Sequence, residues 1–158
     1  MSNSVARPSD GVDLSLAERA RAMLEGAIAP PPIAQLIGFR PVALEPGRAV
    51  FELDTDLDRH ANPMGTLHGG ILCDLADAAM GFAYGSTLAE AESFTTLELK
   101  INFLRPVWQT RLTAVGHVVQ RGRTVGLVEC DVTDAQGRLV ARAGSTCMTL
   151  REAQAHGR

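Results

Sequence analysis

The 158-residue sequence predicts an α+β fold in which one long helix packs against an antiparallel sheet of about six strands. Residues 70–86 have the composition of a helix that is apolar around most of its surface, and such a helix is covered on most sides. Residues 40–54 before it and 93–150 after it alternate apolar and polar side chains with the period of two that is typical of strands. The simplest arrangement is therefore a single curved sheet wrapped around the helix.

The N-terminal region predicts a helix ahead of the sheet. Residues 1–12 are polar and rich in turn formers, as expected of a loose leader. Residues 13–28 have helical spacing of their apolar side chains, and Ser15 and Glu18 are placed to form a capping box. The prolines that follow end this helix, and residues 33–39 predict one short helical turn. We therefore divide the chain into a leader and helix at 1–34, one domain at 35–150 and a tail at 151–158.

Turn signals divide the domain into strands. Residues 45–48 predict the turn of a first hairpin, and residues 55–69 predict a loop. After the helix, four strands are expected as an antiparallel meander, because their connections are short. These strands are expected within residues 93–106, 111–122, 123–137 and 138–150. One face of the first is expected to carry Leu97, Leu99, Ile101 and Phe103.

Composition and charge exclude several classes of protein. The formal net charge is −3 with both signs interspersed, so the chain lacks the basic face of a nucleic-acid-binding protein. Because there is no signal peptide and no apolar run of about 18 residues, we expect a cytoplasmic protein that does not engage a membrane. Cys73, Cys130 and Cys147 are widely spaced among apolar residues, which favours small buried side chains over a disulfide framework. No spacing of histidines or cysteines predicts a metal site.

The segment HANPMGTLHGG, residues 60–70, leads into the long helix through three glycines. The first N–H groups of a helix lack internal partners, and the helix dipole is positive there. A carbonyl oxygen bound at the N–H of Gly69 or Gly70 would be polarised, as in an oxyanion site. The alternative is that the two glycines only form a tight turn.

Asp77 is an acid in the middle of the apolar helix, and Asp74 lies one turn before it on the same edge. An acid at such a position is exposed, paired or functional, so the alternative to a catalytic role is a polar seam that faces solvent or a partner chain. A glycosidase pair is not indicated, because the chain has one Trp and one Tyr and so lacks an aromatic platform for sugars. A serine hydrolase and a P-loop are excluded by the absence of their glycine motifs.

Residues 62–77 also carry a combined pattern that resembles one family. Asn62 is followed by the run Gly65-Thr66-Leu67-His68-Gly69-Gly70, and Asp77 lies eight residues beyond Gly69. The pattern resembles the hotdog-fold acyl-CoA thioesterases, in particular the PaaI-like branch with its phenylacetate-pathway and 4-hydroxybenzoyl-CoA types. The segments FTTLELKINFLRPV and RGRTVGLVECDVTDAQGRLVARAGSTCMTL resemble that family's strand after the helix and its closing hairpin.

The resemblance implies an active site between two subunits of a homodimer or of a homotetramer built from two dimers. One chain would supply Asn62, to position water or the carboxylate, and the Gly69 N–H, to polarise the thioester carbonyl. The other chain would supply Asp77 as general base or as nucleophile. His68 would orient the loop or assist near the carbonyl, and Thr96 would help to hold the water.

The expected substrate is an acyl-CoA, with coenzyme A as part of the substrate and no separate cofactor. Arg105, Arg121 and Arg123 are candidates for its phosphates, because arginine pairs well with phosphate oxygens. The alternative is that they are solvated turn residues. A medium-chain or aryl acyl group is expected, and Asp at position 77 favours the phenylacetate-type branch. Its pocket is expected to be lined by Met80, Phe82, Leu88 and Phe94.

Two other functions fit the resemblance. A hotdog dehydratase or hydratase pairs a loop histidine with a helix acid 14 residues later, and His60 and Asp74 have this spacing. A non-catalytic acyl-CoA-binding protein would keep the pocket without the chemistry. Separate substitution of Asp74 and Asp77 distinguishes the first alternative, and tight binding without turnover would indicate the second.

Overall fold

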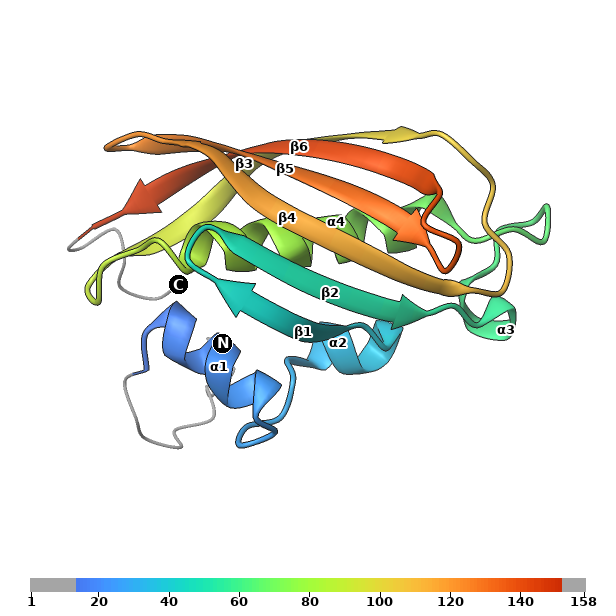
Figure 1. Ribbon diagram of the computed structural model, residues 1–158, viewed down its shortest axis with the longest axis horizontal. Coiled ribbons are helices and arrows are strands. Elements are labelled where there is room, and N and C mark those ends of the chain that lie inside the picture. Colours follow the sequence, from blue (N-terminus) through green and yellow to red (C-terminus); the bar gives the residue numbers. More distant parts are fainter. Residues whose placement is uncertain (1–13, 152–158) are drawn as a thin grey trace, which may run out of the picture.

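The computed structural model describes residues 14–151, in which a six-stranded antiparallel sheet curves around the long helix α4, Gly69–Gly85 (Figure 1). The strand order across the sheet is β1-β2-β4-β5-β6-β3. The predicted α+β hotdog architecture is therefore confirmed. The expected leader at 1–12, and all of the expected tail except residue 151, lie outside the described residues. The strands are β1 (Arg40–Glu45), β2 (Arg48–Asp54), β3 (Ser93–Phe103), β4 (Arg111–Arg121), β5 (Val125–Asp134) and β6 (Leu139–Leu150).

Three short helices precede α4. Helix α1 (Leu16–Leu24) is shorter than expected, but it begins with the predicted capping box between Ser15 and Glu18. Helix α2 (Pro32–Ile37) is the predicted short turn. The prediction of an uninterrupted loop at 55–69 was wrong, because α3 (Leu57–His60) forms there with the Asp56 side chain as its N-cap.

The prediction of a four-strand meander was also wrong. Strands β4, β5 and β6 do pair in sequence order, but β3 pairs with β6 at one edge of the sheet and β4 pairs with β2. The connection from β3 to β4 passes the loop that precedes α4, where the Leu67 N–H donates to the Val107 carbonyl at 2.8 Å. Val107 is buried, so this connection is held against the core rather than folded back as a hairpin.

A β-bulge in β3 changes which side chains face α4. The pairing with β6 shifts between Thr96 and Glu98, so Leu97 occupies the bulge and is 53% exposed. Leu99 and Ile101 still pack against the core, as predicted. Because a bulge inserts one extra residue into the alternation, Thr96 can face the helix together with the residues beyond Leu97.

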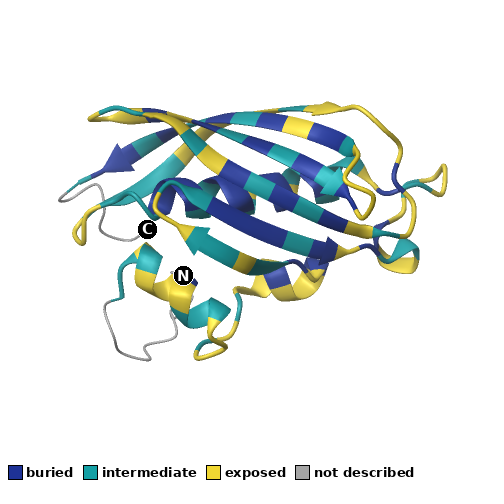
Figure 2. Cartoon of the chain, viewed as in Figure 1, coloured by how far each residue is buried: buried dark blue, intermediate teal, exposed yellow. Residues whose placement is uncertain are grey.

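Helix α4 lies very close to the centre of the sheet. Leu75, Ala76, Ala79 and Ala83 are fully buried on it, and Figure 2 shows the buried residues concentrated on α4 and on the strands around it. On β4, a side chain at Gly116 would overlap the carbonyl oxygen of Ala79 and would stand 2.8 Å from the Met80 nitrogen. Only glycine permits this approach of helix and strand backbones.

The cysteines largely follow the sequence prediction. Cys130 and Cys147 are buried and unpaired, and burial raises the pKa of the Cys130 thiol to about 12. Cys73 differs from the prediction, because it is only partly buried. Among the described helices, none combines the length and the apolar character needed to cross a membrane.

We expect Gly116→Ala to lower the free energy of unfolding by about 1–3 kcal/mol, because the new methyl group must push α4 away from β4. Chemical denaturation measures the change. Gly144→Ala on β6 is the matched control, since the nearest atom to its added methyl group stands at 3.9 Å. Equal stability of the two variants would contradict the close approach of α4 to β4.

Candidate active site

The loop before α4 is organised by the side chain of Asn62. Its Oδ1 accepts hydrogen bonds from the N–H groups of Met64 (2.9 Å) and Thr66 (3.2 Å), and its Nδ2 donates to the Thr66 hydroxyl at 2.8 Å. Gly65 has a φ of 75°, the left-handed conformation that the turn requires. Asn62 therefore shapes the loop and keeps one amide N–H for another partner.

His68 is the N-cap residue of α4. Its Nδ1 accepts a hydrogen bond from the Gly70 N–H at 2.9 Å, and a side chain at Gly70 would meet the same nitrogen. Within the described residues, the Gly69 N–H donates to no protein acceptor. Of the two predicted oxyanion donors, Gly69 is therefore the available one, and His68 caps the start of α4.

A cavity of about 370 Å³ lies beside this helix start. The ring of Phe103 rests on Gly69, and a side chain at Gly69 would stand 2.9 Å from it. Gly69 thus lies beside an apolar ring, and a hydrogen bond to a developing negative charge is stronger in such surroundings than in water. The cavity is lined by Asn62, Thr66, Leu67, Gly69, Leu72, Phe103, Leu104, Arg105, Pro106 and Val107.

Asp77 lies on the edge of α4 that faces β3. The Thr96 hydroxyl donates to its Oδ1 at 3.4 Å, so Thr96 lies beside the acid, and its expected role in holding a water stays a prediction. Burial raises the pKa of Asp77, the Thr96 hydrogen bond lowers it, and the nearby charge of Asp74 raises it further, so that the net shift is upward. A carboxylate with a raised pKa is a better proton acceptor than an ordinary aspartate.

A second, apolar cavity of about 190 Å³ opens beside Asp77. It contains two of the residues expected to line an acyl pocket, Phe82 and Phe94. Met80 lies in the core and Leu88 does not line this cavity. Sequence reasoning missed Leu16, which comes from α1, and the glycines of α4. The lining residues are Leu16, Asp77, Ala78, Gly81, Phe82, Gly85 and Phe94.

Within one chain, the two halves of the site are separate. Gly69 and Asp77 lie eight residues apart on α4, which corresponds to about 12 Å along the helix axis. Asn62 and Gly69 line one cavity and Asp77 lines the other. One half offers an N–H donor for a carbonyl oxygen, and the other offers a carboxylate beside an apolar pocket.

Comparison with known proteins identifies the family. Residues 64–141 match the family model described as thioesterase superfamily. A protein of Saccharolobus solfataricus, named as a candidate esterase, is 37% identical over 75% of this chain and 84% of its own length. The chain belongs to the thioesterase superfamily.

Two further similarities are informative. Human acyl-coenzyme A thioesterase 13 is 28% identical over 66% of this chain and 75% of its own length. The crystal structure of a candidate thioesterase of Ralstonia eutropha, a phenylacetic acid degradation-related protein, superposes with a TM-score of 0.74 and 30% identity. That superposition covers 82% of this chain and 98% of the other. This thioesterase is thus a thioester hydrolase of the hotdog fold with PaaI-like neighbours.

The three arginines predicted to contact coenzyme A are not brought together in one thioesterase chain. Arg121 is held by Glu92 at 3.1 Å, donates to Thr87 and lies over the ring of Tyr84. Arg123 is exposed on the β4–β5 turn, at the opposite end of the sheet from Arg105. Among the three, only Arg105 lines the cavity that contains Gly69.

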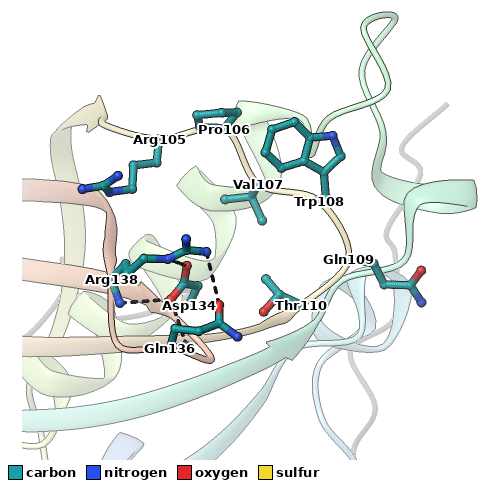
Figure 3. Close-up of a pocket in the computed structure, with 9 residues that line it drawn as sticks. All are labelled: Arg105, Pro106, Val107, Trp108, Gln109, Thr110, Asp134, Gln136 and Arg138. Atoms are coloured by element: carbon teal, nitrogen blue, oxygen red, sulfur yellow. Dashed lines mark hydrogen bonds and ion pairs between the residues drawn. The ribbon is translucent and has the colours of Figure 1, made fainter.

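Arg105 also lines a neighbouring cavity of about 280 Å³ between the β3–β4 connection and the β5–β6 turn (Figure 3). Arg138 lies across from it and is paired with Asp134 at 2.7 Å, so its charge is largely neutralised. Trp108 is half exposed at the rim. Arg105, unlike Arg138, has no ion-pair partner among the described residues.

The geometry does not favour dehydratase chemistry. His60 is buried, its Nδ1 accepts from the Asp56 N–H at 3.2 Å, and its Nε2 meets no partner among the described residues. It lines neither the cavity with Gly69 nor the cavity with Asp77. Asp74 is exposed on the surface of α4, as Asp77 also is in the single chain, so exposure does not separate the two acids. The predicted His60–Asp74 pair therefore lacks an accessible histidine.

We expect His68→Ala to lower the free energy of unfolding by about 1 kcal/mol, because α4 loses its N-cap acceptor. His68→Asn restores an acceptor at the same position and should recover most of the loss. Thermal and chemical denaturation measure both variants. If alanine and asparagine are equally stable at this position, the capping role of His68 is wrong.

Proposed function

We propose that this thioesterase hydrolyses acyl-CoA thioesters at a site that two copies of the chain build together. The supporting observation is the placement of Gly69 and Asp77 on one helix. Each has the chemistry that a thioester needs, yet about 12 Å of helix separates them in one chain. A carbonyl oxygen and the water that attacks its carbon lie much closer than this, so the donor and the carboxylate must come from different copies.

In this proposal, the carbonyl oxygen of the thioester accepts a hydrogen bond from the Gly69 N–H of one copy. The positive end of the α4 dipole strengthens that bond as negative charge develops on the oxygen. Asp77 of the other copy takes a proton from water, which attacks the carbonyl carbon. The tetrahedral intermediate then collapses with loss of the CoA thiolate, and the acid is released.

A second route uses the same geometry. Asp77 attacks the carbonyl carbon itself, the CoA thiolate leaves, and water hydrolyses the resulting anhydride to free acid and carboxylate. Both routes need little acid assistance at sulfur, because a thiol with a pKa of about 8.5 is a good leaving group near neutral pH. Thr96 serves both by donating to the Asp77 carboxylate.

In this proposal, strand β3 supplies the surface for the second copy. It is an edge strand, so one side of its backbone is unpaired, and Leu97, Phe103 and Leu104 are each more than half exposed on or beside it. Pairing of two β3 strands would continue the sheet and bury these side chains. A homodimer follows from the proposal, and a tetramer of two such dimers stays a prediction.

Among the three arginines, Arg105 is the first candidate to contact the phosphates of coenzyme A. Its guanidinium borders the Gly69 cavity and is available for a phosphate. Arg123 can join it only from the second copy, because the length of β3 separates them in one chain. Arg121 is left out of the proposed contacts, since its guanidinium is already engaged by Glu92, Thr87 and Gly122.

We expect Asp77→Asn to lower kcat for acyl-CoA hydrolysis by at least about 100-fold, because the proton acceptor is removed. The free energy of unfolding at pH 7 should not fall, because burial disfavours the ionised carboxylate that asparagine replaces. Thiol release and chemical denaturation measure the two effects. A variant that keeps most of the wild-type rate would exclude Asp77 from the mechanism.

The pH profile tests the environment of Asp77. The carboxylate must be ionised to act, so kcat/KM falls as the pH drops below the pKa of Asp77. Because that pKa is raised, we expect this fall at a higher pH than an ordinary aspartate would give. In Thr96→Val the hydrogen bond that lowers this pKa is lost, so the fall should move to still higher pH. Thr95→Val is the control on the same strand and should leave the fall in place. Movement to lower pH in Thr96→Val would contradict the assignment.

A further inference from the structure

The apolar cavity beside Asp77 has a closed end formed by a different helix. Five of its seven lining residues lie along one edge of α4, from Asp77 to Gly85. This stretch of helix is about 12 Å long. Leu16, the first residue of α1, completes the wall at the Gly85 end.

The distances around Gly85 show which side chains close this end of the cavity. A methyl group at Gly85 would stand 3.5 Å from Cβ and Cδ1 of Leu16 and 3.5 Å from the ring of Phe94. Leu16 and Phe94 therefore come together over Gly85. Nearer to Asp77, a methyl group at Gly81 would stand 3.3 Å from the same ring. The two glycines form the floor of the cavity, and any larger residue would fill it.

Two aromatic contacts hold the side walls in place. Phe82 packs edge-on against Phe51 with ring centroids 5.0 Å apart. Phe94 packs edge-on against Tyr84 with centroids 5.5 Å apart, and Tyr84 is fully buried. Both walls are thus supported from the core, as pre-formed ligand pockets are.

The end wall is supported less firmly than the side walls. Helix α1 packs against β1 and α4, at the bottom of Figure 1, and its start is fixed by the capping box of Ser15 and Glu18. Leu16 is 38% exposed, so it covers the cavity from the solvent side. Shortening this one side chain would open the closed end without removing core packing.

We infer that this cavity binds the acyl group and that Leu16 and Gly85 set the longest group that fits. The inference rests on the proposed function, which places the thioester carbon beside Asp77. The cavity of about 190 Å³ is lined mostly by apolar side chains, and its wall runs along α4 from Asp77 to Gly85. The structure therefore assigns to the site an apolar acyl group of medium length, either a straight chain or one aromatic ring.

The test compares kcat/KM for butanoyl-, hexanoyl-, octanoyl-, dodecanoyl- and phenylacetyl-CoA in four proteins. The wild type should prefer hexanoyl-, octanoyl- and phenylacetyl-CoA. Leu16→Ala should raise the dodecanoyl-to-octanoyl ratio by about tenfold, because the longer chain gains buried methylene contacts. Leu36→Ala, at a 70% exposed leucine on α2, is the matched control and should keep wild-type ratios.

Gly85→Ala is the second variant, and its effect should be opposite. Its methyl group meets ordinary contact distances, so the protein should fold, and alanine favours the helix more than glycine does. The octanoyl-to-butanoyl ratio should fall by about tenfold, because the methyl group occupies the closed end.

The outcomes separate the two proposals. If the wild type hydrolyses none of these esters, the proposed function falls and the inference falls with it. If the wild type hydrolyses them but Leu16→Ala and Gly85→Ala keep its chain-length ratios, only the inference is overturned. Opposite shifts in the two variants, with Leu36→Ala unchanged, support the assignment of α1 as the end wall.

Discussion

The contact between α4 and β4 at Gly116 fixes the geometry on which the site depends. A helix normally stands off a sheet by the length of the side chains between them. Here the backbone of α4 near Ala79 meets the backbone of β4 directly, because Gly116 has no side chain. The small residues Ala76, Ala79 and Ala83 are buried around this point. The position of the helix is thereby set, and with it the positions of both chemical groups that α4 carries.

The two groups on α4, the Gly69 N–H and the Asp77 carboxylate, have opposite physical requirements. Its first turn must leave an N–H free, and His68 achieves this by capping Gly70 while Gly69 stays available. Its middle must hold an acid among apolar atoms, where Thr96 is the hydrogen-bond donor to Asp77. Dehydration of this carboxylate raises its pKa and disfavours its ionised form in the folded state. Such a cost to stability is common where a carboxylate is kept ready to accept a proton.

Local features of the chain could be predicted from the sequence. The long apolar helix, the hairpin turn at 45–48 and the Ser15–Glu18 capping box each depend on neighbouring residues. The pairing of β3 could not be predicted, because it depends on contacts with β6 that lie far away in the sequence. The bulge at Leu97 is likewise set by the pairing with β6. The N-cap role of His68 is local, but histidine is not among the residues usually expected at that position. The place of Leu16 in the cavity depends on how α1 packs on α4, and no pattern in the sequence encodes that.

The most direct test of the two-copy site is to mix two inactive variants. Asp77→Asn removes the carboxylate, and Gly69→Pro removes the N–H at the first helical position, where proline is tolerated. Phe103→Ala accompanies Gly69→Pro to make room for the ring, and Phe103→Ala alone is its control.

After unfolding and refolding an equal mixture, half of the dimers contain one copy of each variant, and each of these has one intact site. We expect recovery of about a quarter of the wild-type activity in a thiol-release assay, because the intact site takes both Gly69 and Phe103 from the Asp77→Asn copy. If each chain carried a complete site, the mixture would stay as inactive as its components, and that result would contradict the account.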